Sequence, residues 1–207
     1  ASLGVLRLLV EKEINIDLGT LIDWALANDW ETDLKSDTKA VLTEYMLDRF
    51  SAWYHDEGIP AEVFQAVRTL GITNALDVNR RVQAVHEFSK LESAEALAAA
   101  NKRVSNILAK NNGDAVSADV DASLFEAAEE KALFEQMTGL KDLIIPSLEK
   151  GNYSMALEAL STLRKVVDDF FDNVMVISDN EAVKNNRLAL LKQLRAMFMG
   201  IADISVL

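Results

Sequence analysis

The stretch AAANKRVSNILAK, residues 98 to 110, predicts a helix with an apolar side and a polar side. Its apolar residues recur at helical spacing and can face a core: Val104, Ile107 and Leu108. Its hydrogen-bond donors lie on the other sides: Asn101, Lys102, Ser105, Asn106 and Lys110. Such a helix can hold phosphates and contact exposed bases of an RNA loop. A solvated helix face is the alternative, and physics alone favours it.

Outward from this stretch, apolar residues at helical spacing predict an all-α chain built as a helical bundle. We expect helices near residues 2–13, 18–30, 38–57, 60–70, 75–90, 93–111, 126–150, 153–172 and 180–200. Residues 113–123 carry several turn formers and are expected to form the one substantial loop. Pro146 is expected to kink or break its helix because proline lacks the amide hydrogen.

The last three predicted helices have apolar sides that a bundle would bury. Their core is expected to contain Phe170, Phe171, Leu188, Leu191 and Leu194. Four aromatic residues nearer the start are expected in a core or an interface rather than stacked on bases: Trp24, Trp30, Trp53 and Tyr54.

The composition is that of a globular helical protein. Half of the 207 residues are apolar, and only two prolines and eight glycines interrupt them. The absence of cysteine excludes disulfides and a thiol nucleophile. The apolar runs are far shorter than the roughly 20 residues that span a bilayer, so we expect no membrane association. The chain lacks an initiator methionine, and we expect it to be a piece of a longer protein.

Charge is unevenly distributed along the chain. The net charge of −12 argues against a general nucleic-acid binder, because Lys and Arg supply most non-specific affinity. From Asn79 to Lys110, however, six Lys and Arg face three Glu, and this window carries +3. We expect any RNA contact to begin there.

The sequence predicts no catalytic centre and no metal site. His55 and His86 are far apart and belong to no metal-binding motif. Asp168, Asp169 and Asp172 lie close on one helix, but a solvated face explains them better than a carboxylate site. Neither a glycine-rich phosphate loop nor a nucleophile turn is present.

Several segments resemble one family in the family's own order. The stretch AAANKRVSNIL, residues 98–108, is similar to the C-terminal region of glycyl-tRNA synthetase β subunits of the bacterial α/β type. The segments LGVLRLLVEK, TEYMLDRF and WYHDEGI, which begin at residues 3, 43 and 53, resemble helices before that region. The segments VDDFFDNVMV, NRLALLKQLR and IADISVL, which begin at residues 167, 186 and 201, resemble its end.

This resemblance implies three parts: residues 1–35 as the end of an HD-like helical region, 36–91 as connecting helices, and 92–207 as a DALR-type anticodon-binding bundle related to that of class I arginyl-tRNA synthetases. It implies a glycine-tRNA ligase component that binds glycine tRNA in the cytoplasm. The separate α subunit of an α2β2 assembly would activate glycine, and the whole enzyme would use ATP and Mg. This chain itself is expected to be non-catalytic and to need no cofactor.

We expect the RNA contacts on the quoted helix and on the helix before it. The expected base and phosphate contacts are Asn101, Lys102, Arg103 and Asn106, with Arg80 and Arg81 as secondary phosphate binders. Two other functions remain open from the sequence: a non-enzymatic helical protein-interaction module, and a free-standing metal or acid-base enzyme.

Overall fold

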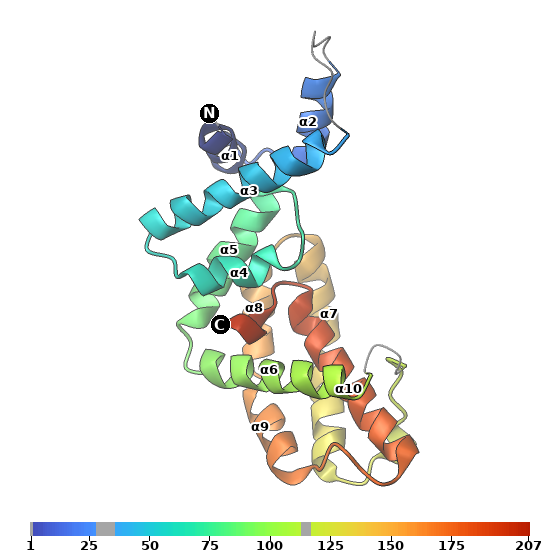
Figure 1. Cartoon of the computed structure of the whole chain (residues 1–207). Helices are drawn as coiled ribbons and strands as arrows, with labels where there is room; N and C mark the ends of the chain where they lie inside the picture. The colour runs from blue at the N-terminus through green and yellow to red at the C-terminus, as the bar shows by residue number, and fades with distance from the viewer. Residues whose placement is uncertain (1, 28–35, 113–116) are drawn as a thin grey trace.

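The computed structural model describes residues 2–27, 36–112 and 117–207, and within them all regular structure is helical (Figure 1). The helices are α1 (Ser2–Glu11), α2 (Leu18–Leu26), α3 (Thr38–Asp56), α4 (Ala61–Arg68), α5 (Ala75–Ser89), α6 (Ala94–Lys110), α7 (Ala128–Glu149), α8 (Tyr153–Ser161), α9 (Arg164–Asn173) and α10 (Glu181–Met199). Two 3₁₀ turns complete the description, η2 (Ala122–Leu124) and η3 (Ile204–Val206). The all-α prediction is confirmed. No helix in these ranges has the length and apolar composition that crossing a membrane requires.

The first three helices form one end of the molecule, where α1 and α2 pack on α3 (Figure 1). The side chain of Asp17 caps α2 by accepting a hydrogen bond from the Thr20 N–H at 3.3 Å. Helix α3 ends before Gly58, whose φ of +75° suits glycine. The stacked rings of Phe50, Trp53 and Tyr54 fill the interior beneath α3. Trp24 is largely exposed, and Trp30 lies outside the described residues.

Helix α5 joins this end to the bundle of α6 to α10. It packs against α8, and the buried apolar side chains run from Leu6 in α1 to Ile204 in η3 as one cluster. Helix α6 lies across the bundle and contacts α9, α10 and η3 (Figure 1). Because η3 packs on both α4 and α6, the end of the chain links the two ends of the molecule.

The predicted core of the bundle is confirmed for four of its five residues, with Phe171 as the exception. Phe170, Leu188, Leu191 and Leu194 are fully buried. Phe171 is only partly buried and packs at the rim, its ring perpendicular to that of Phe170 at 5.5 Å between centroids. Phe171 is turned about 100° from Phe170 around the helix axis, which places its side chain at the edge of the core and not at its centre.

Two predicted helices differ from the structure. The helix expected at 153–172 is two helices, because the chain turns at Thr162 and Leu163, whose N–H groups bond three residues back. Pro146 does not break α7, which continues to Glu149. This proline lies in the last turn of α7, where one lost backbone hydrogen bond leaves the helix in place. The predicted loop is partly outside the described residues; its remainder contains η2.

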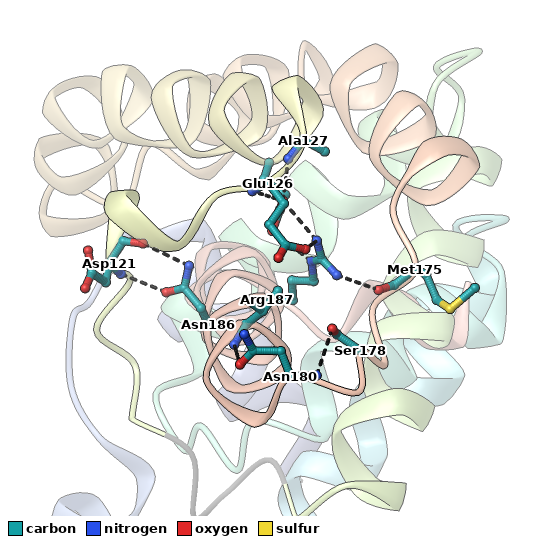
Figure 2. Close-up of polar contacts among 10 residues, drawn as sticks. Asp121, Glu126, Ala127, Met175, Ser178, Asn180, Asn186 and Arg187 are labelled. Carbon is teal, nitrogen blue, oxygen red and sulfur yellow. Dashed lines mark hydrogen bonds and ion pairs between the residues drawn. The ribbon is translucent and has the colours of Figure 1, made fainter.

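A buried ion pair connects the start of α7 to α10 (Figure 2). The guanidinium of Arg187 donates to Glu130 and Glu126, and also to the Met175 carbonyl oxygen at 3.0 Å. Burial would raise the pKa of Glu130, but hydrogen bonds from Arg187 and from the Ala127 and Glu126 N–H groups lower it below its usual value.

Candidate nucleic-acid interface

Helix α6 is amphipathic, and its buried side holds it in the bundle. Its small and apolar residues pack inward: Ala94, Leu97, Ala98, Ala100 and Val104. Helix α6 packs on η3 at the end of the chain. The opposite side of the helix is therefore left to solvent.

Four polar residues form one exposed stripe on α6, which we call the α6 stripe: Lys102, Arg103, Asn106 and Lys110. Lys102, Asn106 and Lys110 are four residues apart, so they lie above one another on the helix surface. Within the described part of the chain, none of the three cations of the stripe forms an ion pair, although many other Lys and Arg do. The stripe thus presents net positive charge on a chain that is acidic overall.

The position of Arg103 is supported by an aromatic ring. Its guanidinium carbon lies 4.3 Å from the centroid of Phe171, the residue at the rim of the bundle. A guanidinium over a ring face keeps its N–H donors directed outward in its own plane. Arg103 is therefore positioned by the fold and still able to bind an anion or stack beneath a base.

Asn101 does not belong to this exposed stripe, contrary to our expectation that its amide is available. Its side chain is buried, and its Nδ2 donates to the Leu97 carbonyl oxygen at 3.0 Å. It follows Leu97 by four residues and precedes Val104 by three, which places it on the inward side of α6. Helical spacing alone indicated that Asn101 faces inward, but asparagine is polar and we therefore expected it to be exposed.

Arg81 is also engaged inside the protein rather than available as a phosphate binder. Its Nε lies 2.9 Å from Asp77 Oδ2, and its Nη2 donates to the Tyr153 hydroxyl at 2.9 Å. Its Nη1 donates to the carbonyl oxygens of Gly200 and Ile201. Burial, together with a hydrogen bond to Asp77, raises the pKa of Tyr153 to about 12, so this phenol stays protonated. The Arg81 guanidinium joins α5, α8 and the end of α10.

Arg80, the neighbour of Arg81, is exposed, but it lies on α5 and is not part of the α6 stripe. It lies on α5 beside the turn between α7 and α8, and its nearest ionic partner is Glu13, 3.8 Å away. Of the six residues expected to contact RNA, Lys102, Arg103 and Asn106 share one exposed face, Arg80 is exposed elsewhere, and Asn101 and Arg81 are used internally.

An open polar hollow of about 750 Å³ lies where α6 ends and α10 begins. Lys110, the last residue of the α6 stripe, lines it together with Asn111, Asn112, Lys184 and Asn185. Carboxylates line it as well, and hydrogen bonds from the Ser123 hydroxyl and N–H lower the pKa of one of them, Asp121. The sequence did not predict this hollow, because its walls are far apart in the chain.

The acidic side chains and histidines of the described ranges do not gather into a metal site. No group of three or more His, Asp or Glu side chains there has the arrangement of a metal site. Asp168 and Asp169 lie beside Arg164 and Lys165 in ion pairs along α9. Their positions fit the solvated helix face that we expected.

Comparison with known proteins identifies the family. A family model described as the DALR anticodon binding domain matches residues 97–204, which include α6 and the bundle. The whole chain is 47% identical to the glycine–tRNA ligase β subunit of Marinobacter nauticus and 50% identical to that of Pseudoalteromonas translucida. The β subunit of Vibrio campbellii is 47% identical over 207 residues. In each comparison all of this chain aligns, and it spans about 30% of the relative's length.

Proposed function

Because the chain belongs to the DALR anticodon binding domain family and is homologous along its whole length to glycine–tRNA ligase β subunits, we propose that it binds the anticodon arm of glycine tRNA. Binding energy gained far from the reacting groups can position the acceptor end of the tRNA and increase specificity. The chain would in this way support glycylation of its tRNA without performing the chemistry.

The observation that carries this proposal is the unpaired positive charge of the α6 stripe. Lys102, Arg103 and Lys110 follow one exposed helix face within the residues that match the family. Cations that lack an ion-pair partner within the described residues attract phosphates, and the counterions released from the RNA on binding are the main source of affinity. On a chain with a net charge of −12, RNA is expected to bind where exposed cations are not offset by carboxylates, and this face meets that condition.

Each residue of the α6 stripe has its own part in this proposal. Lys102 and Lys110 contact phosphates as mobile point charges, and Arg103 binds a phosphate or stacks under a base while Phe171 supports it. Asn106 is exposed and reads the edge of an unstacked base through its amide. Asn101 and Arg81 have no part in it, because their donors already have partners inside the protein.

The wider setting is part of the proposal. A separate α subunit would activate glycine with ATP and Mg in the cytoplasm, and the α2β2 assembly would join it to this RNA-binding region. Residues 92–207 would form the anticodon-binding part, preceded by the connecting helices at 36–91 and the end of an HD-like region at 1–35. The purified chain should then catalyse no ATP–pyrophosphate exchange with glycine.

The test is a salt titration of glycine-tRNA affinity with the chain and its Lys102→Ala/Arg103→Ala variant. If both residues contact phosphates, the plot of log affinity against log salt should flatten by about 1 to 2 units. A matched control is Lys90→Ala/Lys131→Ala, which removes two exposed cations that pair with Glu87 and Glu135. Circular dichroism checks that each variant keeps its helices.

Two outcomes contradict the proposal. An equal loss of slope in the control variant would mean that total charge, and not the α6 stripe, governs binding. Equal affinity for glycine tRNA and for a tRNA with a different anticodon would remove anticodon recognition and leave the helical interaction module as the better description.

A further inference from the structure

A second hollow of about 580 Å³ lies between α5 and the turn that joins α7 to α8. Its polar walls include Asn79, Arg80, Gln83, Lys150, Asn152 and Ser154. We call it the α5–α8 hollow. Among the described residues that line it, two are cations, several carry amides or hydroxyls, and none is a carboxylate.

The two cations of this hollow are available to a ligand. Within the described residues Lys150 forms no ion pair, and Arg80 has only Glu13, whose Oε1 lies 3.8 Å from Arg80 Nη2. That pair is solvent-exposed and longer than a hydrogen bond, so it contributes little and can be exchanged for a stronger partner. Two further carboxylates lie near residues of the hollow. Glu57 accepts a long hydrogen bond from Gln83 at 3.5 Å, and Asp77 is already bonded to Arg81 and Tyr153.

The fold holds the walls of this hollow in place. Arg81 and Tyr153 join α5 to α8 directly beneath it through a hydrogen bond and a ring contact of 4.2 Å. Gly151 has a φ of +69°, and a Cβ built there would lie 3.4 Å from Arg80 Nη1. The positive φ favours glycine at this position, and the Arg80 guanidinium lies close to the turn. A hollow with fixed walls loses little conformational entropy when it binds a ligand.

We propose that the α5–α8 hollow binds a backbone phosphate of the tRNA, as a second contact separate from the α6 stripe. The inference rests on the proposed tRNA-binding function. One unpaired cation, Lys150, and one weakly paired cation, Arg80, suit a phosphodiester within the described residues. The surrounding amides and hydroxyl match the oxygens of phosphate and ribose, including the 2′-hydroxyl. The open shape admits a chain of nucleotides, which continues on both sides of each phosphate.

The experiment compares the salt dependence of glycine-tRNA affinity for the chain and for Arg80→Ala/Lys150→Ala. Loss of two phosphate contacts should flatten the logarithmic salt slope by about 1 to 2 units, whereas Lys90→Ala/Lys131→Ala should not. The charge-preserving variant Arg80→Lys/Lys150→Arg should retain most of the slope. Glu13→Gln should strengthen binding, because it removes the carboxylate that competes for Arg80.

Ethylation interference on the tRNA locates the contact. Ethylating certain phosphates should weaken binding by the unmodified chain, and one group of these effects should disappear in the Arg80→Ala/Lys150→Ala variant. A different group should disappear in Lys102→Ala/Arg103→Ala.

The failures of the two proposals can be told apart. If the unmodified chain does not bind tRNA, the proposed function fails. If it binds and Arg80→Ala/Lys150→Ala keeps the full slope and the full interference pattern, only the second contact is wrong. Saturable binding of inorganic phosphate to the hollow, with tRNA affinity unchanged in the variant, would also overturn the RNA contact.

Discussion

Arg187 in α10 and Glu130 in α7 form a buried, two-bonded ion pair, with Nε 2.9 Å from Oε1 and Nη2 3.2 Å from Oε2. Both side chains are almost inaccessible to solvent. Glu130 also accepts hydrogen bonds from the N–H groups of Glu126 and Ala127. One carboxylate therefore sets the start of α7, and the guanidinium bound to it sets the position of α10.

We predict that Glu130→Gln lowers the free energy of unfolding by about 3 to 5 kcal/mol, since it leaves the buried Arg187 charge without its main partner. Urea denaturation followed by circular dichroism measures the change. Glu129→Gln is the matched control, and it should change stability by less than about 0.5 kcal/mol. Equal effects of the two substitutions would show that the buried pair adds nothing.

The same pair predicts how stability depends on pH. The folded-state pKa of Glu130 is below its ordinary value of 4.5. Its contribution is then fully present above pH 4.5 and is lost as the pH falls through the folded-state pKa. The difference in unfolding free energy between the chain and Glu130→Gln should therefore be constant near neutrality and shrink below about pH 4.5. A difference that does not change down to about pH 2 would contradict this.

Alanine substitution of the two adjacent arginines of α5 should lower stability by very different amounts. Arg81→Ala removes the donors that serve the Gly200 and Ile201 carbonyl oxygens, and should cost about 2 to 4 kcal/mol of stability. Arg80→Ala should cost less than about 0.5 kcal/mol, because its side chain is exposed. Thermal denaturation of both variants measures the two losses of stability. A larger loss for Arg80→Ala would contradict the structural role given to Arg81.

The two asparagines of α6 form another matched pair. Asn106→Ala should reduce discrimination between glycine tRNA and a tRNA with another anticodon, because its amide faces solvent. Asn101→Ala should leave tRNA binding unchanged, since its amide is bonded to Leu97 inside the bundle. Competition binding with the two tRNAs measures both. If only Asn101→Ala reduced this discrimination, Asn106 would not be the residue that contacts a base.

Alanine substitutions at Phe170 and Phe171 should have different main effects, on stability for Phe170 and on tRNA binding for Phe171. Phe170 is fully buried, and Phe170→Ala should cost about 3 to 5 kcal/mol. Phe171→Ala should cost less but weaken tRNA binding, because Arg103 loses the ring that supports it. Denaturation and tRNA titration of the two variants test this. Unchanged tRNA affinity in Phe171→Ala would mean that Arg103 binds without that support.

Helical spacing was enough to predict the all-α class, most helices and the inward residues of the last helix, such as Leu188 and Leu191. Lys102 and Arg103 were predicted from the net-basic window and the family resemblance, and both are exposed. Asn101 was expected to be exposed because it is polar, although its helical spacing from Leu97 and Val104 indicates the buried side. The break between α8 and α9 was not predictable from periodicity, because Leu163 is turned inward by the packing around it.

The sequence by itself determined which residues form helices and which side of each helix is apolar, since both depend on neighbours within a few positions. Only the tertiary structure decided which polar side chains are exposed and which are bonded inside the protein. Arg80 and Arg81 are chemically identical neighbours, yet one is exposed and the other meets carbonyl oxygens more than 100 residues away. Arg187 meets Glu130 across 57 positions, and Lys150 joins Arg80 in one hollow. Such partners depend on how helices pack in space, which helical periodicity does not encode.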